Sequence, residues 1–248
     1  MDLRRLFGRH ESGSILRLRP RGEGSGAQRV DFKELAPDVS TFLGQAAYLQ
    51  LGYFETLSRL IRATPQLAEK EAISLAADAT LRKHRGVIDV IRERGNDPTK
   101  LMLPFQQPLD AFRAQTISPR PRETMLAVYI TAGMLDDFYL ALADSYGDTG
   151  KKVARVLSAD HDREQVADLL TETIRSDEEM RALLSMWARR LVGDTLLVAR
   201  GALVLDASKV PGHEDGVAQG DLESAVEPVF TALMSAHTKR MDALGLAA

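Results

Sequence analysis

A long apolar helix constrains the fold of this chain more than any other feature. The sequence predicts this helix from Pro37 to Thr64, and its central run from Phe42 to Leu57 leaves no polar stripe wide enough to face water. A helix that is hydrophobic on every side is buried among other helices. The run also contains Glu55, and burying an ionised carboxylate is costly unless an arginine, a lysine or a metal ion pairs with it. We therefore predict a helical core in which the partner of Glu55 decides much of the chemistry.

The composition is that of an ordinary globular chain. Its 248 residues are 44% hydrophobic and 27% charged, with a net charge of −3. This length suffices for one sizeable core, and this charge gives no overall basic field that attracts nucleic acid. The absence of cysteine excludes disulfides, thiolate metal ligands and a cysteine nucleophile. No window approaches the roughly 20 consecutive apolar residues of a membrane span, and the charged N-terminus does not resemble a secretory signal. We expect a soluble, cytoplasmic protein without a membrane partner.

Four segments are expected along the chain. They are a disordered arginine-rich arm over residues 1–30, a helical bundle over 31–206, a linker over 207–220 and an amphipathic C-terminal helix over 221–248. The arginines of the arm can contact the phosphates of tRNA or another RNA. The arm has almost no aromatic side chains for base stacking, so a solubilising tail is the other interpretation.

Apolar spacings of three and four residues dominate the chain and predict an all-α fold. The helices expected within the bundle are Pro37–Thr64, Pro65–Arg94, Glu123–Tyr146, Thr149–Arg175 and Glu178–Leu205. A crossover over residues 99–122, with a short helix around residues 110–114, separates the second helix from the third. Two helical hairpins joined by one long connection, with extra C-terminal helices, form the topology of a ferritin-like helical bundle.

Ferritin-like bundles often hold two metal ions through a glutamate from each of two helices and a Glu-x-x-His pair from each of the other two. Each of the four expected helices offers a candidate ligand for iron or manganese. The candidates are Glu55, His84, Asp136, Asp137 and Asp160. Both paired motifs are half lost, because Leu81 stands three residues before His84 and Arg163 stands three residues after Asp160.

Arginine side chains offer a different interpretation of the same residues. A guanidinium group holds carboxylates in bidentate fashion, so Arg163 can replace a metal ion in a core of structural ion pairs. Asp136 and Asp137 point about 100° apart on a helix, so we expect one of them to be solvated or paired with Arg190. Asp194 is expected in a structural ion pair, either with Arg190 or with an arginine of another helix.

Several blocks of the sequence resemble those of actinobacterial ferritin-like proteins that are grouped as similar to the tRNA methylthio-isopentenyl-adenosine hydroxylase. These blocks are Glu34–Pro37, Phe42–Tyr48, Lys83–His84, Leu135–Phe138 and Leu191–Thr195. The resemblance implies a ferritin-like bundle and a non-haem di-iron oxygenase that hydroxylates a modified adenosine of tRNA. It also implies that Glu55, His84, Asp136 or Asp137, and Asp160 hold the iron. Leu81 and Arg163 depart from that pattern and remove a carboxylate and an imidazole.

Two function classes therefore stay open. The first is an oxidoreductase with an iron site, similar to the tRNA hydroxylase. The second is a metal-free, degenerate ferritin-like scaffold that acts as an interaction module, expected as a homodimer. The C-terminal helix favours the second class, because its apolar side chains must cover either the bundle of its own chain or that of a partner. These side chains are Val226, Val229, Phe230, Leu233 and Met241.

Overall fold

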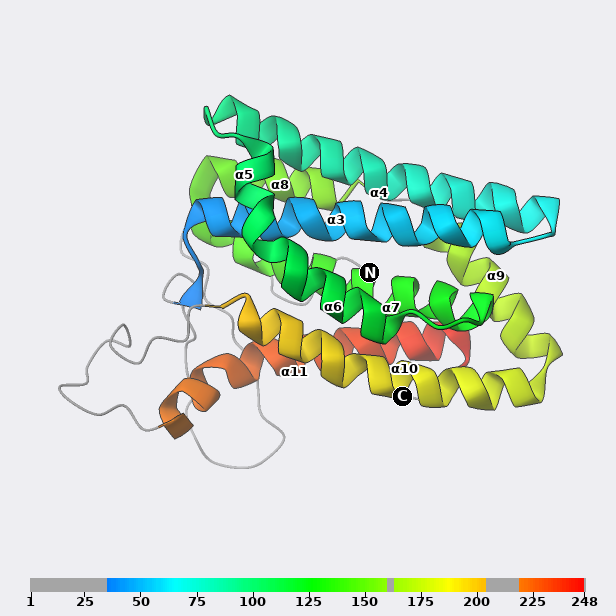
Figure 1. The fold of residues 1–248 in the computed structure, drawn as a ribbon. Coiled ribbons are helices and arrows are strands. Elements are labelled where there is room, and N and C mark those ends of the chain that lie inside the picture. The colour runs from blue at the N-terminus through cyan, green and yellow to red at the C-terminus, as the bar shows by residue number, and fades with distance from the viewer. Residues whose placement is uncertain (1–34, 160–162, 204–218, 248) are drawn as a thin grey trace.

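The structure is a computed structural model that describes residues 35–159, 163–203 and 219–247. Within these ranges the chain forms α-helices and short 3-10 turns, and no strand (Figure 1). The predicted all-α fold is confirmed, including two helical hairpins joined by a long crossover.

The first hairpin consists of α3 (Val39–Ala63) and α4 (Leu67–Glu93), which lie side by side along the molecule (Figure 1). Asp38 fixes the start of α3, because its carboxylate accepts hydrogen bonds from the backbone N–H groups of Ser40 and Thr41. Both helices begin and end within two residues of the predicted positions. As predicted, α3 buries side chains around most of its circumference.

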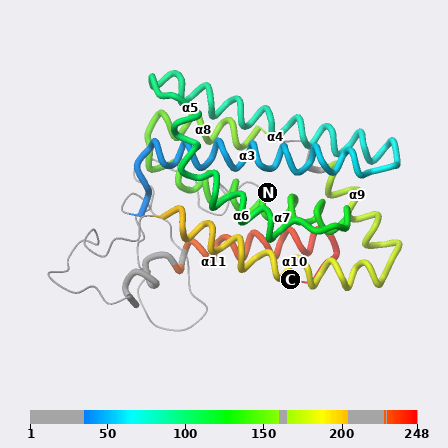
Figure 2. The backbone as a smooth tube through the Cα atoms, in the orientation of Figure 1, coloured from blue at the N-terminus to red at the C-terminus, as the bar shows by residue number. Residues whose placement is uncertain are grey.

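The crossover is more helical than predicted. It comprises α5 (Pro98–Met102), the 3-10 turn η1 (Leu103–Phe105) and α6 (Gln106–Thr116), whereas the sequence predicted a mostly irregular segment with one short helix. The prolines explain the difference. Pro98 and Pro104 occupy the first positions of α5 and η1, where a missing N–H group costs no hydrogen bond. Figure 2 follows this segment across α3 towards the second hairpin.

The second hairpin pairs α7 (Pro121–Ala143) with two shorter helices. After the 3-10 turn η2 (Asp144–Tyr146), α8 (Gly147–Leu157) and α9 (Arg163–Ser176) both contact α4 and α7. The prediction of one continuous helix over residues 149–175 is wrong. The sequence around the interruption is rich in serine and aspartate, whose side chains compete for the backbone hydrogen bonds of a helix.

Two further helices cover the outer face of α7. They are α10 (Glu178–Gly201) and α11 (Gln219–Leu244), and α11 also contacts α9 and α10. Val229, Leu233 and Met241 of α11 are buried in this contact. The C-terminal helix therefore covers the bundle of its own chain.

The helix α7 lies between these layers and is the most apolar segment of the described residues. A window within residues 121–157 is long and apolar enough to cross a membrane by composition alone, contrary to the expectation from the sequence. However, 78% of that window is buried inside the protein. Its hydrophobic character therefore matches its position as the central helix of a packed bundle.

Candidate functional site at the centre of the bundle

Three helices bring three polar side chains together at the centre of the bundle. Asp136 of α7 accepts a hydrogen bond from Lys83 Nζ of α4 at 2.8 Å on Oδ2, and one from Gln50 Nε2 of α3 at 2.6 Å on Oδ1. The side chains of Lys83 and Asp136 are only 4% and 3% exposed. The ammonium and carboxylate groups are therefore an ion pair removed from water.

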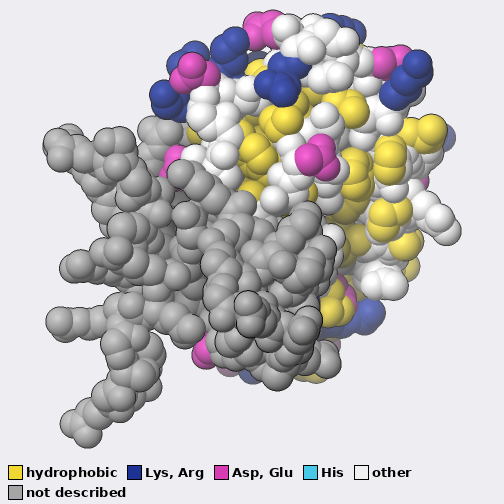
Figure 3. Space-filling model, turned by 90° about the vertical axis from the view of Figure 1, so that its left-hand side faces the viewer, with side chains coloured by type: hydrophobic (Ala, Val, Ile, Leu, Met, Phe, Trp, Pro, Cys, Tyr) yellow, Lys and Arg dark blue, Asp and Glu magenta, His cyan; other side chains and the backbone are white. Residues whose placement is uncertain are grey.

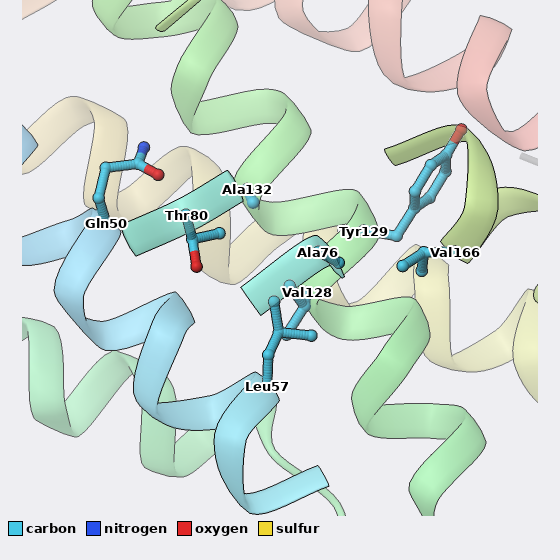
Figure 4. Close-up of a pocket in the computed structure, with 8 residues that line it drawn as sticks. All are labelled: Gln50, Leu57, Ala76, Thr80, Val128, Tyr129, Ala132 and Val166. Carbon is cyan, nitrogen blue, oxygen red and sulfur yellow. The ribbon is translucent and has the colours of Figure 1, made fainter. Parts of the chain in front are cut away.

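A small cavity lies beside Gln50, the amide partner of Asp136. Its volume is about 30 Å³, and it lies between Gln50, Thr80, Leu57, Val128 and Val166 of four different helices (Figure 4). This volume holds about one water molecule. This cavity thus has room for a hydrating water beside Gln50 but not for a substrate.

A second buried ion pair joins α7 to α11. Arg240 Nη2 contacts Asp137 Oδ2 and donates a hydrogen bond to the Gly133 carbonyl oxygen at 3.0 Å. The two charged side chains are 17% and 10% exposed. Gly133 permits this approach, because a β-carbon built there would lie 2.6 Å from Arg240 Nε. His237, one turn before Arg240, is also buried, and burial together with the charge of Arg240 lowers the pKa of its imidazole to about 4.

The two adjacent aspartates therefore differ from the expectation. They do point in different directions, but neither is solvated, and in the described structure neither forms an ion pair with Arg190. Asp136 faces the centre of the four helices and Asp137 faces α11. Both are buried because α11 gives α7 a second covered side.

A third ion pair holds α6 against α3. Arg113 Nη1 donates hydrogen bonds to Glu55 at 2.6 Å and to the Gly52 carbonyl oxygen at 3.1 Å, and Arg113 Nη2 contacts Asp110. Burial raises the pKa of Asp110, but hydrogen bonds from Tyr48 and Arg113 outweigh it and hold the pKa below its usual value. Of the three partners expected for Glu55, an arginine, a lysine or a metal ion, the described structure shows an arginine. The prediction that Glu55 is buried is wrong, because its side chain is 44% exposed beside the short helix α6.

The remaining predicted site residues do not join these clusters. His84 is half-buried, and its Nδ1 lies 2.9 Å from the Ala47 carbonyl oxygen. Arg190 lies over the Trp187 ring, 5.2 Å from its centroid, and among the described residues no ion pair joins it to Asp194. Asp160 and the side chain of Arg163 lie outside the described part, so their predicted roles stay predictions.

The chain also matches the model of a protein family described as "Ferritin-like domain, actinomycetes" over residues 34–208. The chain belongs to this family. No curated protein matches it. The resemblance to actinobacterial ferritin-like proteins is therefore confirmed at the level of the fold, while its extension to a tRNA hydroxylase stays a prediction.

The described residues of this ferritin-like domain do not fit a di-metal centre. Among them, no three histidine, aspartate or glutamate side chains converge as metal ligands. The predicted carboxylate ligands within the described residues face cationic side chains instead: Glu55 faces Arg113, Asp136 faces Lys83 and Asp137 faces Arg240. Such a cation repels a divalent ion and uses the carboxylate lone pairs that would coordinate it.

Lys83 was not among the site residues predicted from the sequence, although it is the cation at the centre of the bundle. A signal was present in the sequence, because Ile73, Ala76, Thr80, Lys83 and Val87 follow one another at helical spacing. An apolar stripe that continues through a lysine indicates a buried ammonium group, which needs a carboxylate on a neighbouring helix.

Proposed function

We propose that this protein is a metal-free ferritin-like scaffold that acts as an interaction module. The observation that carries the proposal is the Lys83–Asp136 ion pair at the centre of the bundle. Here an ammonium group of the chain itself balances the carboxylate, as a metal ion does in the metal-binding relatives of this fold.

The electrostatics of the central site support this assignment. A buried carboxylate is stable as an anion only when a cation and hydrogen-bond donors compensate for its lost hydration. Lys83 supplies the positive charge to one oxygen of Asp136, and the Gln50 amide donates to the other. A divalent ion at this place has to compete with the ammonium group of Lys83, whose side chain is only 4% exposed.

The interaction role is supported by the surface. Large hydrophobic side chains are exposed on the described helices, among them Leu103 at 63%, Met186 at 69% and Leu197 at 68%. Figure 3 shows hydrophobic side chains on the surface at one end of the molecule. Exposed hydrophobic side chains of this kind can pack against a partner protein or a second copy of the chain. The expected homodimer and the RNA contact of residues 1–30 are part of the proposal, and that arm lies outside the described residues.

Elemental analysis of protein produced in iron-rich medium tests this function. We expect iron and manganese well below stoichiometric amounts in the wild type and in Glu55→Ala. We also expect a thermal midpoint that neither a chelator nor added ferrous ion changes, because a ligand that binds only the folded state would raise it. Stoichiometric iron that is lost in Glu55→Ala would overturn the scaffold proposal and favour the hydroxylase.

A further inference from the structure

A second cavity of about 520 Å³ lies between the crossover and α10, away from the central ion pair. Side chains of η1, α6 and α10 form its walls, among them Phe105, Leu109, Phe112 and Val198, and Tyr139 of α7 also lines it. Leu109, Phe112 and Tyr139 are buried, whereas Leu197 at the α10 side is exposed. The cavity is therefore a pocket that reaches from the core to the surface.

The size and lining of this pocket suit a small molecule. Ligand pockets typically have volumes of about 300–1,000 Å³ and mainly apolar walls with a few polar groups. The polar groups here are Gln45, Gln115, Tyr139 and Asp194. The Tyr139 hydroxyl donates to Gln45 Oε1 at 3.4 Å, and burial raises the pKa of Tyr139, so this phenol stays neutral.

The charge of the pocket determines which charged group a mainly apolar ligand can carry. Of the described residues that line it, Asp194 is the one charged side chain, and no lysine or arginine is among them. The carboxylate of Asp194 repels fatty acids and phosphates and attracts a cation, and it lacks an ion-pair partner among the described residues. Phe105, Phe112 and Tyr139 add aromatic faces, which attract ammonium groups at short range.

We propose that this pocket binds a mainly apolar molecule that carries a primary amine, with the ammonium group on Asp194 and the hydrocarbon part against the crossover. A charge-assisted hydrogen bond from the ammonium group to a half-buried carboxylate supplies the selectivity. The hydrocarbon part supplies affinity by burial. This site is separate from the Lys83–Asp136 pair, so the proposal does not depend on whether the centre of the bundle binds metal.

Calorimetric titration of the full chain with three probes of equal length tests the proposal. The probes are decylamine, decanol and decanoate, each below its micelle concentration, at pH 7 and low salt. We expect decylamine, protonated at this pH, to bind about ten-fold tighter than decanol, which corresponds to about 1.4 kcal/mol. Decanoate should bind most weakly.

Three variants assign the binding to this pocket. Asp194→Asn should remove the preference for decylamine and leave the affinity for decanol unchanged. Ala111→Trp, at an exposed lining position of α6, should weaken the binding of decylamine and decanol without unfolding the protein. Glu179→Gln removes an exposed carboxylate from the other end of α10 and should retain the preference. Equal affinities for decylamine and decanol, no binding of any probe, or an unchanged preference in Asp194→Asn would overturn the proposal.

Discussion

At the scale of single residues, Lys83 and Asp136 show how a buried charge depends on its partner. Each group loses its hydration on folding, and their mutual attraction with the Gln50 hydrogen bond compensates for that loss. Such a pair adds little stability compared with an apolar pair of the same volume. When one member of the pair is removed, the other stays buried as an uncompensated charge, and this lowers the stability of the fold.

We predict that Lys83→Met and Asp136→Leu each lower the free energy of unfolding by about 3–5 kcal/mol. The double variant should lose much less than the sum, because no buried charge remains in the pair. Urea unfolding of the four proteins measures this coupling. Lys151→Ala serves as control, because Lys151 and Asp148 form an exposed pair at 2.9 Å, and its effect should stay within about 1 kcal/mol. Additive single effects would contradict the central ion pair.

His237 should make the stability depend on pH. Its folded-state pKa of about 4 lies below the ordinary value of 6.5, so the unfolded chain takes up this proton first as the pH falls. Stability from the neutral imidazole is present above pH 6.5 and is lost as the pH falls towards 4. After allowance for solvent screening, the loss should be roughly 2 kcal/mol. Urea midpoints between these pH values should depend less on pH in His237→Leu, and an unchanged slope would contradict this assignment.

The sequence predicted the residue types of the site better than their pairing. Asp136, Asp137 and Glu55 were identified as buried or helix-embedded carboxylates, and each has a cationic partner. Lys83 and Arg240 were missed as those partners, because each contact joins helices that are far apart in the chain. Spacing along one helix cannot indicate which side chains of two helices meet.

At the scale of the elements, glycine sets how closely the crossover approaches α3. A β-carbon built at Gly44 would collide with the Leu101 carbonyl oxygen of α5 and would lie 2.9 Å from Phe105 Cε2. The side of α3 that carries Gly44 therefore has to stay small for α5 to pack there. The sequence showed this glycine within an apolar run but did not indicate what approaches it.

We predict that Gly44→Ala destabilises the protein by about 1–3 kcal/mol, because α5 must move away from α3. Gly193→Ala is the matched control, since a β-carbon at Gly193 of α10 meets nothing within 4 Å. This change should stabilise α10 by roughly 0.5–1 kcal/mol through helix propensity alone. Thermal and urea unfolding measure both effects, and a destabilised Gly193→Ala or a neutral Gly44→Ala would contradict this packing.

The two interrupted segments mark the limit of prediction for elements. Helical spacing located the hairpins, because their apolar stripes continue over many turns. It did not reveal the division between α8 and α9, although a signal was present: Leu157 and Val166 are both buried but nine residues apart, which would place them on opposite faces of one continuous helix. It also underestimated the helices of the crossover, where prolines at helix starts resembled loop residues.

At the scale of the whole molecule, α10 and α11 turn a four-helix arrangement into a bundle with α7 at its centre. We predict that deletion of residues 219–248 lowers the urea midpoint and exposes apolar surface that binds a fluorescent hydrophobic dye. The reason is that α11 buries Val229, Leu233 and Met241 and pairs Arg240 with Asp137. Deletion of residues 1–30, the predicted arm, should leave the midpoint unchanged. Equal midpoints for both deletions would contradict the covering role of α11.

The cation at the centre of this bundle is made with the polypeptide, since it is the side chain of Lys83. A bound metal ion, in contrast, exchanges with the surroundings, and its supply varies with growth conditions. The metal-free scaffold that we propose needs no loading step after synthesis and loses nothing to a competing chelator. We therefore expect the folded fraction of this protein to be the same in iron-starved and iron-rich cells.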